Sequence, residues 1–380
     1  MKASCSLAIV GSGVTGLSTA YSLCKRGLKD IVILEKGHLS SGASTRNGGG
    51  VRAQFTTQEN IILAKWSIRR FRRMASELGV NFWFRQGGYL FLAESDEELS
   101  TLRKAVSIQN ENKLDSRIID QSEIKSLVPE IEVEGLVGGS FRKGDAVLFP
   151  FPLLFGYASF LRNQGVSIET QCEAKKIKKV SAGYDIETTR GSIHASKLLN
   201  AAGGWSSEVS QMLGCPIPTR PVRHQIMAST PLKPFLDPMV VTIRDGFYMS
   251  QAVRGELIGG ITEPLPHPSD TSMNGSLFCR LISKRITGLF PRLSSVCMMR
   301  QWAGFYDMSP DANPILDILP GTDNAYIACG FSGHGFMISP AVGEFMACLI
   351  MDDKPCFPAG PYRLDRFQKE VVSKEALVIG

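Results

Sequence analysis

Residues able to bind a nucleotide stand near the start of the chain. Gly11, Gly13 and Gly16 form a G-x-G-x-x-G pattern directly after an apolar run at positions 6–10. The first glycine permits a tight turn, the second lets backbone N–H groups approach a pyrophosphate, and the third allows close packing of helix on strand. Glu35 follows a second apolar run about 20 residues later, where a carboxylate can bind a ribose diol. This pattern predicts a dinucleotide site and leaves NAD and FAD both open.

A stretch of small residues, SSGASTRNGGG, follows at positions 40–50. Glycines and small side chains let a backbone lie flat along an extended cofactor, and an NAD enzyme seldom needs such a stretch after the ribose acid. The stretch therefore favours FAD, although taken alone it is also typical of a surface loop. The candidate cofactor residues in this region are Lys36, Ser44, Thr45, Arg46, Asn47 and Gly49.

Composition limits the class of protein. The chain has 380 residues, 43% of them hydrophobic, which is enough for two domains with separate cores. Its net charge is only +6. We interpret the basic runs at 69–73 and 175–179 as solvated helix and strand faces, so no nucleic-acid partner is expected.

Cysteine usage and hydropathy bear on location. The nine cysteines are scattered, with no C-x-x-C pair, which predicts reduced thiols in the cytoplasm and no metal site. No signal-peptide pattern is seen. The longest apolar stretch, 336–351, contains Pro340 and Glu344 and is too short to cross a bilayer, so no membrane span is expected.

The predicted elements describe an α/β protein, α+β overall. A strand–helix–strand unit occupies 6–34, and further helices are expected at about 58–78 after a capping box at 56–59, at 95–112, at 150–164 and at 339–351. Strands are expected within 81–93 and at 166–169, 174–180, 184–188, 197–200 and 325–329. Between 222 and 261 strands alternate with turns at 245–246 and 254–255, which predicts an antiparallel sheet.

Five motifs resemble the D-amino-acid oxidase superfamily of flavoproteins, which includes sarcosine oxidase, glycine oxidase and dye-linked L-proline dehydrogenase. They are the N-terminal unit, GGGVR at 48–52, NAAGGWS at 200–206, WAG at 302–304 and GFSGHGF at 330–336. The likeness extends over nearly the whole chain and is greatest to the β subunits of archaeal dye-linked L-proline dehydrogenases, including PVRHQ at 221–225. The resemblance implies a discontinuous Rossmann-type FAD domain (1–80, 140–220 and 306–380) and a substrate domain on an antiparallel sheet (81–139 and 221–305).

The resemblance also implies a set of site residues. Cofactor contacts are expected from Ala202, Gly203 and Trp205, and from the glycine-rich turn before the last helix, whose positive end would face the flavin. That turn and the start of its helix contribute Gly330, Ser332, Gly333, His334, Gly335, Phe336 and Met337. For His334, a flavin contact and a packing role are both open.

Arg52 is the expected anchor for a substrate carboxylate, because a guanidinium offers a planar two-donor fork. The alternative is an arginine at the surface or beside a phosphate. Tyr248 and Tyr306 fall where glycine oxidase places substrate-contacting residues, and both are equally open to being core. Met337 and Ile258 stand where sarcosine oxidase carries a second cation and an oxygen-activating lysine, and its flavin-tethering cysteine aligns near Gly304.

These departures imply non-covalent FAD and poor reaction with O₂. The expected activity is a dehydrogenase that oxidises a small amino acid, with L-proline giving pyrroline-5-carboxylate, by hydride transfer to flavin N5. Other subunits of an electron-transferring complex are the expected partners, with an FMN shared with one of them as a further expectation. The alternatives are an oxidase of sarcosine, glycine or a D-amino acid that releases hydrogen peroxide, and an FAD-holding electron-transfer subunit without its own substrate.

Overall fold

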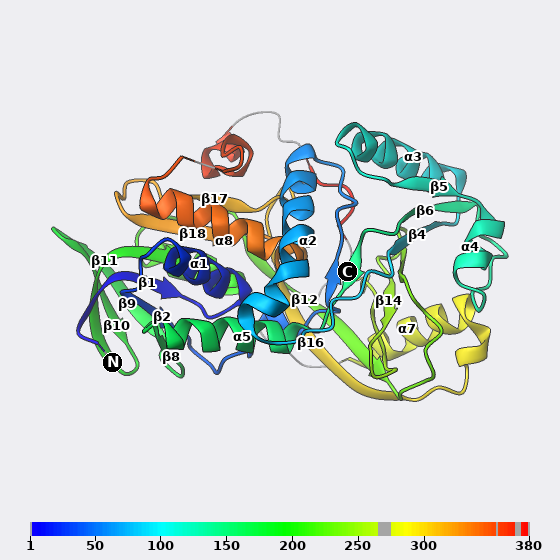
Figure 1. Cartoon of the computed structure of the whole chain (residues 1–380), viewed down its shortest axis with the longest axis horizontal. Coiled ribbons are helices and arrows are strands. Elements are labelled where there is room, and N and C mark those ends of the chain that lie inside the picture. The colour runs from blue at the N-terminus through cyan, green and yellow to red at the C-terminus, as the bar shows by residue number, and fades with distance from the viewer. Residues whose placement is uncertain (1, 265–274, 355, 369–373, 379–380) are drawn as a thin grey trace.

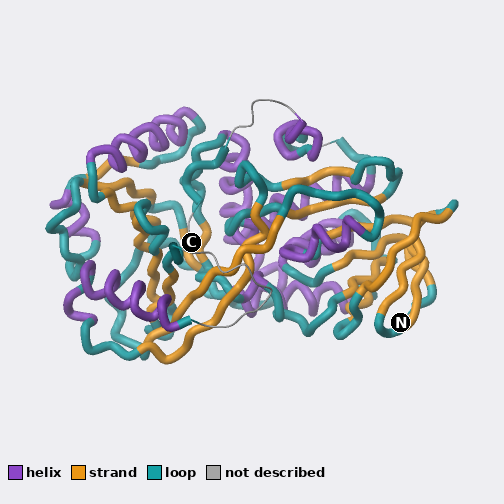
Figure 2. Tube along the Cα trace, turned by 180° about the vertical axis from the view of Figure 1, so that it is seen from behind, coloured by secondary structure: helices purple, strands orange, loops and turns teal. Residues whose placement is uncertain are grey.

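The computed structural model describes residues 2–264, 275–354, 356–368 and 374–378. Within them the chain forms two lobes, each built on an eight-stranded sheet (Figure 1). Strands β12 (Arg220–Ser229) and β16 (Met298–Met308) run from one lobe into the middle of the molecule, and the C-terminal segment lies between the lobes (Figure 2). None of the helices in the described part of the chain has the length and apolar character that a membrane span needs.

The first sheet carries the predicted strand–helix–strand unit at its centre. The strand β1 pairs in parallel with β2 on one side and β11 on the other. The helix α1 between β1 and β2 packs against α8, and α2 and α5 complete this layer. The strand order is β17 (Ile315–Ile318), β18 (Ala325–Cys329), β11 (Gly191–Asn200), β1 (Ser4–Val10), β2 (Ile31–Leu34) and β8 (Ser167–Glu169), with β10 (Gly183–Thr188) and β9 (Ala174–Val180) extending from β11. The helices are α1 (Val14–Lys25), α2 (Gln58–Leu78), α5 (Pro150–Asn163), the short α6 (Ser206–Gln211) and α8 (Gly335–Met351).

The second sheet is antiparallel except for one parallel pair, β13 with β4. Its order is β16 (Met298–Met308), β12 (Arg220–Ser229), β15 (Leu257–Gly260), β14 (Tyr248–Gln251), β13 (Met239–Thr242), β4 (Tyr89–Ala93), β6 (Gly138–Arg142) and β5 (Arg117–Ile119). The helices α3 (Asp96–Glu111), α4 (Gln121–Leu127) and α7 (Ser276–Leu289) belong to this lobe, and a small ladder joins β3 (Gly50–Val51) to β7 (Ala146–Val147).

Most predicted elements are confirmed, and the departures have physical causes. The bounds of β2, β9 and β18 are those expected, and α2 ends at Gly79, which adopts the left-handed conformation. Within 81–93 only Tyr89–Ala93 is a strand, and the expected antiparallel sheet contains the parallel β4 because β4 enters it from a distant part of the chain. The helices α4, α6 and α7 and the strands β3, β5, β6, β7, β16 and β17 were not predicted. The α7 face shows buried Phe278, Ile282 and Ile286 at four-residue spacing.

The capping box predicted at 56–59 is wrong. Thr57 is the N-cap of α2, but its side chain makes no capping bond to the helix. The Glu375 carboxylate accepts instead from the backbone N–H groups of Thr56 and Thr57, at 3.0 and 3.2 Å, and from both of their hydroxyls. The helix start is therefore capped by a residue more than 300 positions away, which a local pattern cannot reveal.

The expected domain division stays a prediction. Strands of the second sheet come from both ranges assigned to the substrate domain, while β6, β12 and β16 each cross one of the proposed boundaries. Parts of the assigned ranges, 265–274, 369–373 and 379–380, lie outside the described residues.

Candidate functional site

A cavity of about 630 Å³ opens where β1 ends and α1 begins. We call it the cofactor cavity. Twelve of the predicted cofactor residues line it: Gly11, Gly13, Glu35, Lys36, Ser44, Asn47, Ala202, Gly203, Trp205, Gly333, Gly335 and Phe336. Of the others, Arg46, Ser332, His334 and Met337 line a second, smaller cavity beside it. Gly16, Thr45, Gly49 and Gly330 line neither and support the surrounding turns.

The glycines of the first turn have the close contacts that the sequence pattern requires. Gly11 has φ +108°, and a Cβ there would lie 2.4 Å from the Ala201 carbonyl oxygen. A Cβ on Gly16 would lie 2.1 Å from the Gly11 carbonyl oxygen. Any side chain at these positions would force β1, α1 and the 200–202 turn apart.

Polar groups in this cavity are held in place. Ser12 donates to Glu35 from its backbone N–H at 3.0 Å and from its hydroxyl at 2.8 Å, and Gly37 N–H donates to the other carboxylate oxygen. Ser44 Oγ accepts from the Val14 N–H at 2.9 Å, at the first turn of α1. Lys36 Nζ lies 3.3 Å from the centre of the Trp205 ring, and desolvation lowers the pKa of this lysine.

These features fit a dinucleotide. The cavity combines a helix N-terminus bounded by glycines, which suits a pyrophosphate, with a fixed carboxylate one strand away, which suits a ribose. Gly333, Gly335 and Phe336 bring the start of α8 to the opposite wall. The chain thus has the donor and acceptor set that such a cofactor needs.

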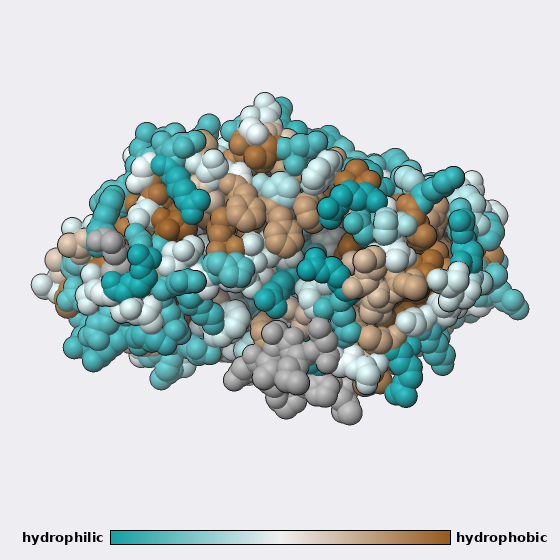
Figure 3. Space-filling view, turned by 90° about the horizontal axis from the view of Figure 1, so that it is seen from below, coloured by the Kyte–Doolittle hydropathy of each residue, from teal (hydrophilic) through white to brown (hydrophobic). Residues whose placement is uncertain are grey.

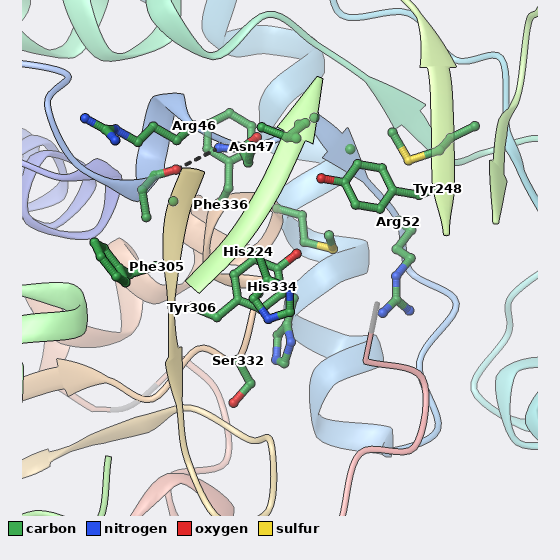
Figure 4. A pocket seen from close by; sticks show the side chains of 18 of the residues that line it. Arg46, Asn47, Arg52, His224, Tyr248, Phe305, Tyr306, Ser332, His334 and Phe336 are labelled. Carbon is green, nitrogen blue, oxygen red and sulfur yellow. Dashed lines mark hydrogen bonds between the residues drawn. The ribbon is translucent and has the colours of Figure 1, made fainter. Parts of the chain in front are cut away.

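The second cavity, of about 70 Å³, adjoins the first (Figure 4). We call it the substrate cavity. All four predicted catalytic residues, Arg52, Tyr248, Tyr306 and His334, line it. The two cavities share six lining residues: Ala43, Asn47, Phe305, Tyr306, Gly333 and Phe336. The two cavities therefore adjoin along these residues.

The aromatic wall of the substrate cavity comes from three strands. Tyr306 on β16 stacks on His224 of the neighbouring β12, with ring centres 3.9 Å apart, and Tyr248 projects from β14 (Figure 4). Burial raises the pKa of Tyr306 to about 12 and raises that of Tyr248 well above its usual value. Both hydroxyls therefore stay protonated at neutral pH.

Known proteins that are similar to this chain identify the family to which it belongs. The family model described as FAD dependent oxidoreductase, DAO, matches residues 6–349. The chain belongs to the DAO family of FAD-dependent oxidoreductases. It is 30% identical to the sarcosine oxidase subunit beta of Rhodobacter capsulatus over 98% of this chain and 91% of that protein, and 29% identical to that of Rhizobium meliloti over 95% and 88%.

The fold agrees with that assignment. The solved structure of L-proline dehydrogenase from P. horikoshii matches with a TM-score of 0.93 and 31% identity, covering 98% of this chain and all of that one. Glycine oxidase from Geobacillus kaustophilus matches with a TM-score of 0.90 at 24% identity, which shows a shared fold. As a DAO-family protein the chain has FAD as its cofactor, and the cofactor cavity is where the FAD fits.

Arg52 of this DAO-family chain is buried, so it is not the surface arginine that was one alternative. Its side chain is 2% exposed, and it donates to the carbonyl oxygens of Gln54 and Leu377. The guanidinium lies over the Phe55 ring at 4.1 Å, while its Nε has no hydrogen-bond partner within the described residues. Desolvation lowers the pKa of Arg52, and Glu375 is the charge that most offsets this effect. Two of its nitrogens are thus held by the backbone, and a buried donor remains.

His334 also has unmet hydrogen-bonding capacity. It lies just before α8, is 2% exposed, and neither ring nitrogen finds a partner in the described part of the chain. Its ring lies 5.2 Å from that of Phe55. Burial lowers the pKa values of His334 and His224 to about 4, so both rings are neutral at pH 7.

Two residues that line the cavities were not predicted as site residues from the sequence. His224 was noted only as part of a motif, and the signal available was its place on a strand of the substrate sheet. Asp307, next to Tyr306, lines the cofactor cavity with one carboxylate oxygen unpartnered within the described residues, and burial raises its pKa to about 7. No pattern marked Asp307, because its burial depends on three separate segments.

Proposed function

We propose that this chain is an FAD-dependent dehydrogenase of a small amino acid, with L-proline as the preferred substrate and pyrroline-5-carboxylate as the product. The observation that carries the proposal is Arg52, which lines an aromatic cavity beside the cofactor cavity. Its guanidinium is buried, and its Nε–H has no hydrogen-bond partner within the described residues. A buried cation in such a place suits a carboxylate, which is the group common to amino-acid substrates.

Each wall of the substrate cavity has a role in the proposal. Arg52 binds the substrate carboxylate at one end. The stacked His224 and Tyr306, with Tyr248, confine the carbon skeleton and exclude water. Because both histidines are neutral, they add no positive charge that would repel a substrate arriving with a protonated amine.

The chemistry requires little acid–base help from the protein. A substrate bound with its amine unprotonated loses a hydride from carbon, and the amine lone pair then forms an imine. FAD, when bound, supplies the hydride acceptor. The residues that would hold it are those of the cofactor cavity, with the glycines around Gly11 at the pyrophosphate and Glu35 at the ribose. The protein's own contribution is orientation and desolvation.

Proline specificity and dehydrogenase activity rest on separate support. The L-proline dehydrogenase of P. horikoshii covers this chain almost completely, and the small, largely aromatic cavity suits a compact substrate. No lysine lines the substrate cavity among the described residues, which supports slow reaction with O₂. Ile258 lies on β15 and lines neither cavity, so its apolar side chain has no direct bearing on the reaction with O₂.

An oxidase is the second candidate, because the sarcosine oxidase β subunits are similar over nearly the whole chain. The name of those relatives also supports partner subunits. An apolar surface suited to a partner includes Trp83, Phe151 and Phe155, which are 40%, 38% and 50% exposed. Apolar side chains gather near the middle of the face in Figure 3. A shared FMN has no support in the relatives' names or the described cavities and is not part of the proposal.

The scattered cysteines support the cytoplasm as the proposed location, because none of them is joined to another in a disulfide within the described residues.

The test is an anaerobic titration of the FAD-loaded protein. L-Proline, D-proline, sarcosine and glycine are added separately while the flavin absorbance is recorded. The proposal expects rapid bleaching by L-proline and slow recovery in air without stoichiometric hydrogen peroxide. Bleaching by sarcosine or glycine with prompt peroxide release would replace it with the oxidase. A flavin that none of the four bleaches would overturn the proposed substrates.

A further inference from the structure

Two cysteines meet at the far end of α8, away from both cavities. Cys348 lies in the last turn of the helix and is buried, and Cys356 is exposed on the segment that follows. Their Sγ atoms are 3.2 Å apart. Asp352 ends α8 in the left-handed conformation, and the Asp353 N–H donates to the Cys348 carbonyl oxygen, which turns the chain back towards the helix.

The position of Cys356 is fixed by its neighbour. Phe357 is 7% exposed, and its ring packs edge-on against Trp66 of α2 at 5.7 Å. The two sulfur atoms are therefore held together by a helix turn on one side and a buried aromatic contact on the other. We propose that Cys348 and Cys356 form a dithiol site that is oxidised to an intramolecular disulfide.

The oxidant for this site is a small disulfide such as oxidised glutathione. The thiolate of Cys356, the accessible member, attacks one sulfur of the oxidant and releases one thiol. Cys348 then attacks the mixed disulfide, a Cys348–Cys356 bond forms, and the second thiol leaves. Two protein thiols lose two electrons and two protons, and the small disulfide is reduced to two thiols.

A metal is the competing occupant, because Glu344 lies one turn before Cys348 and completes a group of three ligands. The charge around the pair argues against it. Arg26 pairs with Glu344, lies 3.4 Å from Cys348 Sγ through Nη2, and contacts Asp353 at 3.3 Å. A divalent cation would compete with this guanidinium for the same oxygen and sulfur atoms.

The local electrostatics agree with a stable disulfide. Burial, together with the hydrogen bond between the two thiols, raises the pKa of the Cys356 thiol to about 12. The thiolate of Cys356 is therefore not stabilised. A stabilised thiolate is what makes a disulfide easy to reduce, so the bond formed here should resist reduction. The same effect makes oxidation slow at neutral pH, so the site stays reduced where small disulfides are scarce.

Closing this bond would tie α8 to the segment anchored on α2. The opposite end of α8, at Gly335–Met337, lines both cavities. The disulfide thus stabilises the helix that presents the glycine-rich turn to the cofactor, and a rise in the unfolding temperature of roughly 3–8 °C is expected.

The test treats the FAD-loaded protein with oxidised glutathione at mildly alkaline pH. The expected result is a loss of about 2 Da in intact mass, from two hydrogens, and a fall from nine titratable thiols to seven in denaturant. Peptide mapping should find Cys348 linked to Cys356. Cys356→Ser should abolish the loss, whereas Cys297→Ser, a change at another exposed cysteine, should leave it intact.

Three outcomes would overturn the inference. They are nine thiols remaining after treatment, a cross-link between other cysteines, and stoichiometric binding of added zinc that protects these two thiols. Activity of the enzyme is not a readout here, so the result is independent of the proposed function.

Discussion

The cofactor cavity and the substrate cavity share a wall but are built in different ways. The cofactor cavity is lined by short continuous runs of the chain, such as residues 10–15, 34–37 and 201–205. The polar groups of the substrate cavity come from several short segments that lie far apart in the chain, with Arg52, His224 and Tyr248 each from a different one. The first is therefore a local feature of the sequence, and the second exists only in the folded protein.

The largest effect is expected from breaking the cofactor cavity at Gly11. Gly11→Val places a side chain 2.4 Å from the Ala201 carbonyl at φ +108°, so the turn cannot keep its shape. FAD affinity should fall on the order of 100-fold. The measurement is flavin released per mole of purified protein. Gly288→Ala, in α7 with no atom near the added Cβ, is the control and should keep its flavin. Full flavin content in Gly11→Val would refute the assignment.

The next effect separates the two cavities. Arg52→Met should lower kcat/KM for the substrate roughly 100- to 1000-fold, because a buried partner of a charged group is lost, while flavin content stays unchanged. Anaerobic stopped-flow reduction at varied substrate gives both values. Arg52→Lys keeps the charge without the fork and should recover part of the loss. Substrate affinity equal to that of the unaltered enzyme in Arg52→Met would remove Arg52 from the site.

A smaller effect is expected on the shared wall. Tyr306→Phe removes one hydroxyl and keeps the stacked ring, so kcat/KM should fall about 3- to 10-fold, as for one hydrogen bond. Tyr326→Phe, a buried tyrosine on β18, is the matched control and should leave turnover unchanged. Equal losses in the two variants would mean that the Tyr306 hydroxyl acts only through the core.

The last prediction concerns Asp307, where the smallest effect on activity is expected. The measured quantity is the stability of the fold. Burial raises the pKa of its carboxyl from 3.8 to about 7. Between these values the folded state holds a proton that the unfolded state has lost, so stability falls as pH rises to about 7 and is then constant. Asp307→Asn cannot ionise and has no such loss. The unfolding free energy of the variant, minus that of the unaltered protein, should therefore increase by about 2 kcal/mol from pH 5 to pH 8. Thermal unfolding at both pH values checks this, and an unchanging difference would contradict the buried ionisation.

The contrast between the cavities also explains what the sequence could predict. The G-x-G-x-x-G pattern, Glu35 and the run at 40–50 each lie within one short segment. Their residue types alone indicate how the backbone or side chain there can meet a nucleotide. Arg52 and the two tyrosines came only through the resemblance to a family, because nothing local marks them. The Tyr306–His224 stack depends on the register between β12 and β16, which pairs His224 with Gly304 and Val222 with Tyr306. No short segment of the sequence predicts that register or the capping of α2 by Glu375, because both depend on residues far apart in the chain.

The contact between Arg52 and Leu377 bears on how the protein is made. The two residues are 325 positions apart, and Glu375 beside Leu377 caps the helix that begins six residues after Arg52. During synthesis, the Gly11 turn and its helix are available from the first tens of residues, whereas Arg52 must wait for Leu377 to leave the ribosome. Until then its guanidinium lacks the carbonyl that holds it. Nascent chains should accordingly expose the β1–α1 segment long before they can complete the substrate anchor.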